Sequence, residues 1–140
     1  MDLEIILCPI GMAPNHEDHK ILKEMANASN HFKLIIPRNI YEIMYLIAYA
    51  KIFVGTSLHG IITAQSYNVP FIALNKKIKK TKEYISTWMP NYTDYNLDFN
   101  EIDKLTLLIN KWDSNNLEKY TREQKIKVVD NLSFIFSNLI

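Results

Sequence analysis

The chain has 140 residues, of which 48% are hydrophobic and 22% charged, and this composition excludes a disordered chain and fits one globular domain. The formal net charge of +1 argues against a dedicated nucleic-acid-binding protein. A single cysteine, Cys8, excludes an internal disulfide framework, and no apolar run approaches the roughly 20 residues of a membrane span, so we expect a cytoplasmic protein without an integral membrane segment.

Strands and helices are predicted to alternate along the first part of the chain. Compact apolar runs predict strands at residues 3–8, 32–36, 52–54 and 71–74. Apolar residues at helical spacing predict helices at 16–27, 40–50 and 61–67, and Asn15 is suited to cap the first of them. This alternation predicts an α/β fold of the Rossmann-like kind, with a doubly wound parallel sheet covered by helices on both faces.

The composition changes after the fourth strand. Residues 75–82 include five lysines, and residues 83–89 are predicted to form a short helix. A polar stretch that we expect to be irregular follows at 91–100, and helical spacing returns at 101–112 and 114–140, where a break would fall near Thr121. We therefore expect a parallel-sheet core in residues 1–90 and a linker with C-terminal helices in residues 91–140, packed on the same domain.

The turn after the third strand has the most informative residues. It reads Gly-Thr-Ser-Leu-His-Gly at 55–60 and contains two of the chain's three glycines. A turn at the carboxyl end of a parallel strand begins a helix, whose free N–H groups and positive dipole end attract an anion. His59, next to two hydroxyl-bearing residues, favours a ligand site. The alternatives are glycines that merely serve tight turns and a histidine ring bonded to a backbone carbonyl.

Ligands of doubly wound sheets bind beyond the carboxyl ends of the strands. Three predicted turns and the lysine-rich segment meet at this edge, which predicts a cationic pocket for a phosphorylated or carboxylated small molecule. His59 is the candidate catalytic residue. The candidate substrate-binding residues are Gly11, His16, Arg38, Gly55, Thr56, Ser57, Leu58, Gly60, Lys76, Lys77 and Lys79. The alternative for the lysines is a solvated surface.

Other classes of site are disfavoured. His16 and His19 lie three residues apart, which is not the HExxH spacing of zincins, so we expect no metal site. The turn at 55–60 is neither a P-loop nor a GxGxxG motif, and we expect no cofactor. A receiver domain is disfavoured because no acidic pair ends the first strand and no aspartate ends the third. Cys8 ends an apolar run and is interpreted as a buried structural thiol.

These motifs resemble the carboxyl-terminal lobe of the polysaccharide pyruvyl transferase family over about residues 3–89. The family signature is roughly G-x-R-L-H-x-x-x-x-A, followed by G-V-P and a strand. This sequence matches it at Gly55, Leu58, His59 and Ala64, and then reads Asn68-Val69-Pro70 before the apolar run 71–74. The resemblance implies one lobe of a GT-B-like fold.

The resemblance also implies an enzymatic activity. Family members transfer the pyruvyl unit of phosphoenolpyruvate to two hydroxyls of a sugar during exopolysaccharide biosynthesis, forming a cyclic ketal and releasing phosphate. Leu58 and His59 match the part of the motif that contacts phosphoenolpyruvate. The residue types agree, because a histidine can donate and accept protons near neutral pH. Two alternatives stay open: a nucleotide-sugar glycosyltransferase lobe, and a non-catalytic binding or assembly domain that is degenerate at the donor site.

The sequence departs from the family signature at Ser57, which replaces the arginine. Serine lacks the charge and the paired donors with which arginine binds carboxylate or phosphate, so Arg38 or a lysine at 76–79 is expected to supply a cation. A two-lobed transferase needs roughly twice this length. We therefore expect phosphoenolpyruvate and a saccharide acceptor to bind with the help of a missing N-terminal lobe or of another copy, and the isolated chain to bind weakly without turnover.

Overall fold

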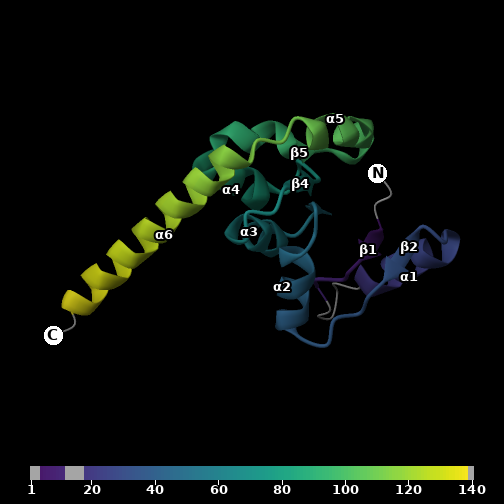
Figure 1. Ribbon diagram of the computed structural model, residues 1–140, viewed down its shortest axis with the longest axis horizontal. Helices are drawn as coiled ribbons and strands as arrows, with labels where there is room; N and C mark the ends of the chain where they lie inside the picture. The colour runs from purple at the N-terminus through teal and green to yellow at the C-terminus, as the bar shows by residue number, and fades with distance from the viewer. Residues whose placement is uncertain (1–3, 12–17, 139–140) are drawn as a thin grey trace. The chain divides into compact units, whose positions relative to one another are not determined.

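The computed structural model describes residues 4–11 and 18–138, which divide into two compact units, Met1–Leu46 and Ile47–Ile140. Each unit combines parallel strands with helices (Figure 1). The predicted α/β, Rossmann-like class is therefore confirmed. None of the described helices is long and apolar enough to cross a lipid bilayer.

The first unit is built around a pair of parallel strands. Its elements are β1 (Ile5–Leu7), α1 (Asp18–Ala28), β2 (Phe32–Leu34) and most of α2 (Ile40–Ala48). Ile5 pairs with Phe32 and Leu7 with Leu34. Asp18 lies in the first turn of α1, where a carboxylate stabilises the positive end of the helix dipole. The predicted cap Asn15 lies outside the described residues.

The second unit contains a three-stranded parallel sheet in the order β3-β4-β5. Its elements in chain order are β3 (Phe53–Gly55), α3 (Leu58–Ser66), β4 (Phe71–Leu74), α4 (Lys79–Trp88), the 3-10 helix η1 (Pro90–Tyr95), β5 (Asn96–Leu97), the 3-10 helix η2 (Phe99–Lys104), α5 (Leu105–Asn110) and α6 (Ser114–Ser137). The central strand β4 buries Phe71, Ile72 and Ala73 completely. Such burial on both faces is typical of a parallel strand covered on each side.

A cluster of aromatic side chains forms much of this core. Phe71 contacts Trp112 edge to face, with ring centroids 5.3 Å apart, and lies 5.9 Å from Tyr92. The Tyr92 hydroxyl donates a hydrogen bond to the Asp113 carbonyl oxygen, and the Tyr95 hydroxyl donates to that of Lys111. Burial raises the pKa of Tyr92 to about 12, with a further contribution from Asp113. The cluster thus joins β4 and η1 to the chain between α5 and α6.

Helix α6 is buried against the second unit in its first two turns, and further along it Gln124 accepts a hydrogen bond from the Tyr84 hydroxyl and Lys127 lies over the Trp88 ring of α4. Leu117 is fully buried, and the Thr121 hydroxyl lies 3.1 Å from the Gln65 carbonyl oxygen of α3. Figure 1 shows the rest of α6 extending away from the sheet of this unit, and its residues from 125 to 138 are all exposed. The helix passes Thr121 without a break, because this threonine faces the core and also bonds within the helix, to the Leu117 carbonyl oxygen.

The largest differences from the predicted elements lie between α3 and β5. Helix α3 begins at Leu58 instead of Ile61, and α4 begins at Lys79 instead of Glu83, so part of the lysine-rich segment is helical. The stretch expected to be irregular contains η1 and β5, because Tyr92, Tyr95 and Leu97 are buried there. The division of the chain into residues 1–90 and 91–140 stays a prediction.

Candidate functional site

The turn between β3 and α3 is built around a helix cap. Ser57 has extended backbone angles (φ −77°, ψ 119°), and its Oγ accepts a hydrogen bond of 3.2 Å from the Gly60 N–H. The Ile61 N–H donates to the Ser57 carbonyl oxygen at 3.1 Å. Within the described residues, the N–H groups of Leu58 and His59 have no acceptor. Two of the four orphan donors of this helix end are therefore available to a ligand.

The glycines of this turn do not serve a left-handed backbone. Neither Gly55 nor Gly60 has a positive φ, and Gly60 is buried within α3. A Cβ at Gly55 would lie 3.0 Å from Cζ of the Phe53 ring, so the close approach here is to that ring. Among the described residues the positive φ angles belong to Asn68 and Asn75.

His59 lies in the first turn of α3 with its side chain exposed to solvent. Its carbonyl oxygen accepts a hydrogen bond of 2.8 Å from the Thr63 hydroxyl. The imidazole has no hydrogen-bond partner in the part of the chain that the structure describes, so the alternative of a ring bonded to a backbone carbonyl is not observed. The imidazole is therefore available to contact a ligand that binds at the unpaired amides.

Arg38 belongs to the first unit and already has a carboxylate partner. Its Nη2 lies 2.5 Å and its Nε 2.6 Å from Glu42 Oε1, while its backbone N–H donates to Glu42 Oε2. This contact raises the pKa of Arg38 and lowers the pKa of Glu42. Gly11, in the same unit, donates its N–H to Asp18 Oδ2 at 3.4 Å. His16 lies outside the described residues. The membership of Gly11, His16 and Arg38 in one site stays a prediction.

The three candidate lysines follow β4 and differ in their partners. The Lys76 ammonium lies 2.5 Å from Glu101 Oε2, and that of Lys79 lies 3.6 Å from Glu83 Oε1. Lys77 donates its backbone N–H to Asn75 Oδ1, and its ammonium has no carboxylate partner among residues 4–11 and 18–138. Because β3 and β4 are parallel neighbours, the turn at 55–60 and these lysines follow the same edge of the sheet.

Glu101 forms an ion pair with Lys76 and was not predicted from the sequence as a residue near the site. It accepts hydrogen bonds from Lys76 and Lys104, and it completes a capping box with Asp98 at the start of η2. An acidic or hydroxyl residue followed three positions later by glutamate is a recognisable helix-start pattern. These contacts lower the pKa of Glu101 from 4.5 to about 2, first through Lys104 and then through Lys76.

We expect the Glu101→Gln variant to respond less to acid than the unmodified chain. A carboxylate whose pKa is lower in the folded chain stabilises the fold above the unfolded pKa near 4.5, and this contribution is lost as the pH falls to about 2. The measurement is the urea midpoint at several pH values across this range. Glu118→Gln, at an exposed position in α6, serves as the matched control and should keep the full pH dependence.

Comparison with known proteins identified a family model that matches this chain. The family model described as polysaccharide pyruvyl transferase matches residues 1–77, which is more than half of the chain. The matched region includes β1 to β4 and the turn at 55–60, and it ends among the lysines after β4. Neither the curated proteins nor the solved structures include a match to this chain.

Proposed function

Because the chain belongs to the polysaccharide pyruvyl transferase family, we propose that it serves in moving the pyruvyl group of phosphoenolpyruvate to a sugar of a cell-surface polysaccharide. The observation that carries this proposal is the exposed His59 beside the unpaired N–H groups of Leu58 and His59. We further propose that the chain acts in the cytoplasm as one lobe of a GT-B-type enzyme, with the cyclic ketal formed against a second lobe or a second copy.

The start of α3 is suited to the phosphate of the donor. Two backbone N–H groups and the positive end of the helix dipole favour an anion there. Ser57 replaces the family arginine, and its hydroxyl is engaged with the Gly60 N–H, so it adds no charge. Since Lys76 and Lys79 have carboxylate partners, we assign the missing cationic role to Lys77.

The proposed reaction places His59 at the vinyl group of the donor. The imidazolium gives its proton to the methylene carbon, the first sugar hydroxyl bonds to C2, and the hydroxyl proton returns to the imidazole. The second hydroxyl then bonds to the same carbon, the bond from C2 to the phosphate oxygen breaks, and the second hydroxyl proton leaves with the phosphate. The N–H groups at the start of α3 stabilise the charge of the departing phosphate.

A pair of substitutions at Leu58 tests whether its N–H binds the donor. Leu58 is the first residue of α3, where proline is tolerated, and the extended angles of Ser57 suit a residue before proline. Leu58→Pro removes the backbone N–H together with the leucine side chain. Leu58→Ala also removes the leucine side chain but keeps the N–H. Because a hydrogen bond to a charged group contributes about 1.5–3 kcal/mol, we expect Leu58→Pro to weaken phosphoenolpyruvate binding about tenfold or more relative to Leu58→Ala.

The readout is the dissociation constant for phosphoenolpyruvate from calorimetry on the whole chain. Circular dichroism of both variants shows whether α3 is retained. Equal affinities of the two folded variants would mean that the Leu58 N–H does not contact the donor, and the assignment of the phosphate to this helix start would be wrong.

A further inference from the structure

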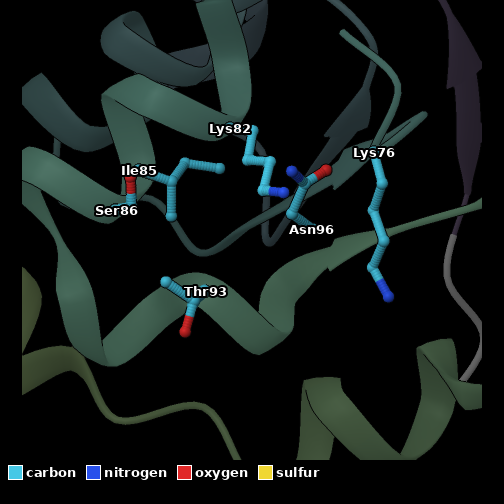
Figure 2. A pocket seen from close by; sticks show the side chains of 6 residues that line it. All are labelled: Lys76, Lys82, Ile85, Ser86, Thr93 and Asn96. Atoms are coloured by element: carbon cyan, nitrogen blue, oxygen red, sulfur yellow. The ribbon is translucent and has the colours of Figure 1, made fainter. Parts of the chain in front are cut away.

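A second site in the same unit lies between α4, η1 and β5. It is a pocket of about 130 Å³ lined by Lys76, Lys82, Ile85, Ser86, Thr93 and Asn96. Figure 2 shows Lys82, Ile85 and Ser86 reaching it from α4, Thr93 from η1 and Asn96 from β5. This volume exceeds the roughly 10–15 Å³ that one water needs, so the pocket has room for a small molecule.

The pocket is cationic. No carboxylate lines it, and the Lys82 ammonium has no acidic partner within 4.0 Å in the part of the chain that the structure describes. Lys76, at the other end, is held by Glu101. In Figure 2 the Lys82 side chain extends toward Asn96, while that of Lys76 extends away from both. Lys82 is therefore the cation that an anionic group in the pocket would meet.

The oxygen atoms around the pocket lack hydrogen-bond donors. Asn96 is only 4% exposed, and its Oδ1 has no partner among the described residues, so a buried acceptor is left unsatisfied here. The Ser86 hydroxyl donates to the Glu83 carbonyl oxygen and the Thr93 hydroxyl to that of Pro90, so both hydroxyl oxygens keep free lone pairs. A ligand hydroxyl can donate to Ser86 Oγ, and to Asn96 Oδ1 once its carboxamide turns about its soft terminal torsion, whereas the Thr93 hydroxyl points away from Lys82 and Asn96 (Figure 2).

We propose that this pocket binds a small anion that also has hydroxyl groups, either a phosphorylated polyol or a hydroxycarboxylate of about three carbons. The anionic group pairs with Lys82, and the hydroxyl groups donate to Ser86 and Asn96. This inference does not depend on the proposed pyruvyl transfer, because it uses none of the residues at 55–60.

The test is calorimetry on the whole chain with glycerol 3-phosphate, glycerate, inorganic phosphate and glycerol. We expect saturable millimolar or tighter binding of glycerol 3-phosphate or glycerate, weaker binding of phosphate, and none of glycerol. Whichever of these two compounds binds more tightly shows whether the pocket prefers a phosphate or a carboxylate. Lys82→Gln should weaken this binding about tenfold, as expected for the loss of one charge-assisted hydrogen bond.

Two variants separate a formed site from general attraction to lysines. Lys80→Gln is the matched control, because Lys80 is an exposed lysine of α4 that does not line the pocket. It should leave the affinity unchanged. Ser86→Ala should weaken the binding of glycerol 3-phosphate but not the binding of inorganic phosphate. Absence of saturable binding, or equal losses in Lys82→Gln and Lys80→Gln, would overturn the proposal. Binding that persists in Leu58→Pro separates this pocket from the phosphoenolpyruvate site.

Discussion

Replacing Phe71 with alanine is expected to lower the free energy of unfolding of the second unit by about 3–5 kcal/mol. Phe71 is fully buried in the central strand β4, where it contacts Tyr92 and Trp112. Its removal leaves a cavity in the aromatic cluster and takes away an edge-to-face contact that adds about 0.5–1.5 kcal/mol beyond the area buried. The measurement is urea unfolding followed by tryptophan fluorescence.

Phe99→Ala is the matched control for this substitution. Phe99 begins η2 and is 58% exposed, so we expect its replacement to change the unfolding free energy by no more than about 0.5 kcal/mol. Similar losses in the two variants would mean that the aromatic cluster is not the core of this unit.

Leu117→Ala is expected to cost about 2–5 kcal/mol, again because a fully buried side chain is truncated. The effect should be greatest on α6, since Leu117 is fully buried and lies one turn before Thr121, which bonds to the Gln65 carbonyl oxygen of α3. Amide hydrogen exchange should therefore accelerate most along α6, and urea unfolding gives the overall loss.

The control for Leu117 lies on the same helix. Leu132→Ala changes a side chain that is 48% exposed, and its replacement should leave the exchange rates of residues 114–121 unchanged. If Leu132→Ala released the start of α6 as strongly as Leu117→Ala, the attachment of the helix would not depend on its first two turns.

The sequence was most informative where one segment forms its own structure. The apolar run at 71–74 predicted β4 without error, because a short continuous apolar run followed by a change in composition is typical of a buried parallel strand. The run at 52–54 predicted β3 to within one residue at each end. The order of strands and helices through α3 was predicted correctly, because the spacing of apolar residues differs between the strands and the helices.

The sequence was least informative where the structure depends on distant contacts. β5 has only two residues, Asn96 and Leu97, and its pairing with β4 depends on tertiary packing. Lys76 and Glu101 are 25 residues apart, so their ion pair was not visible in the pattern, and Lys76 was interpreted as a ligand cation. The pocket at Lys82 and Asn96 was missed for the same reason. By contrast, the role of Ser57 as the cap of α3 follows a local rule, because serine is a preferred N-cap residue, although Ser57 was predicted only as a ligand-binding residue.

The most direct test of the proposed function is a titration of the isotope-labelled chain with phosphoenolpyruvate, followed through its backbone amide resonances. We predict saturable shifts concentrated at residues 55–60, largest at the unpaired amides of Leu58 and His59, and smaller shifts near Lys77. If the resonances of these amides did not shift while amides elsewhere did, the assignment of the donor to the start of α3 would be contradicted. Shifts at 55–60 with a uridine or guanosine nucleotide, but not with phosphoenolpyruvate, would instead indicate a nucleotide-sugar donor.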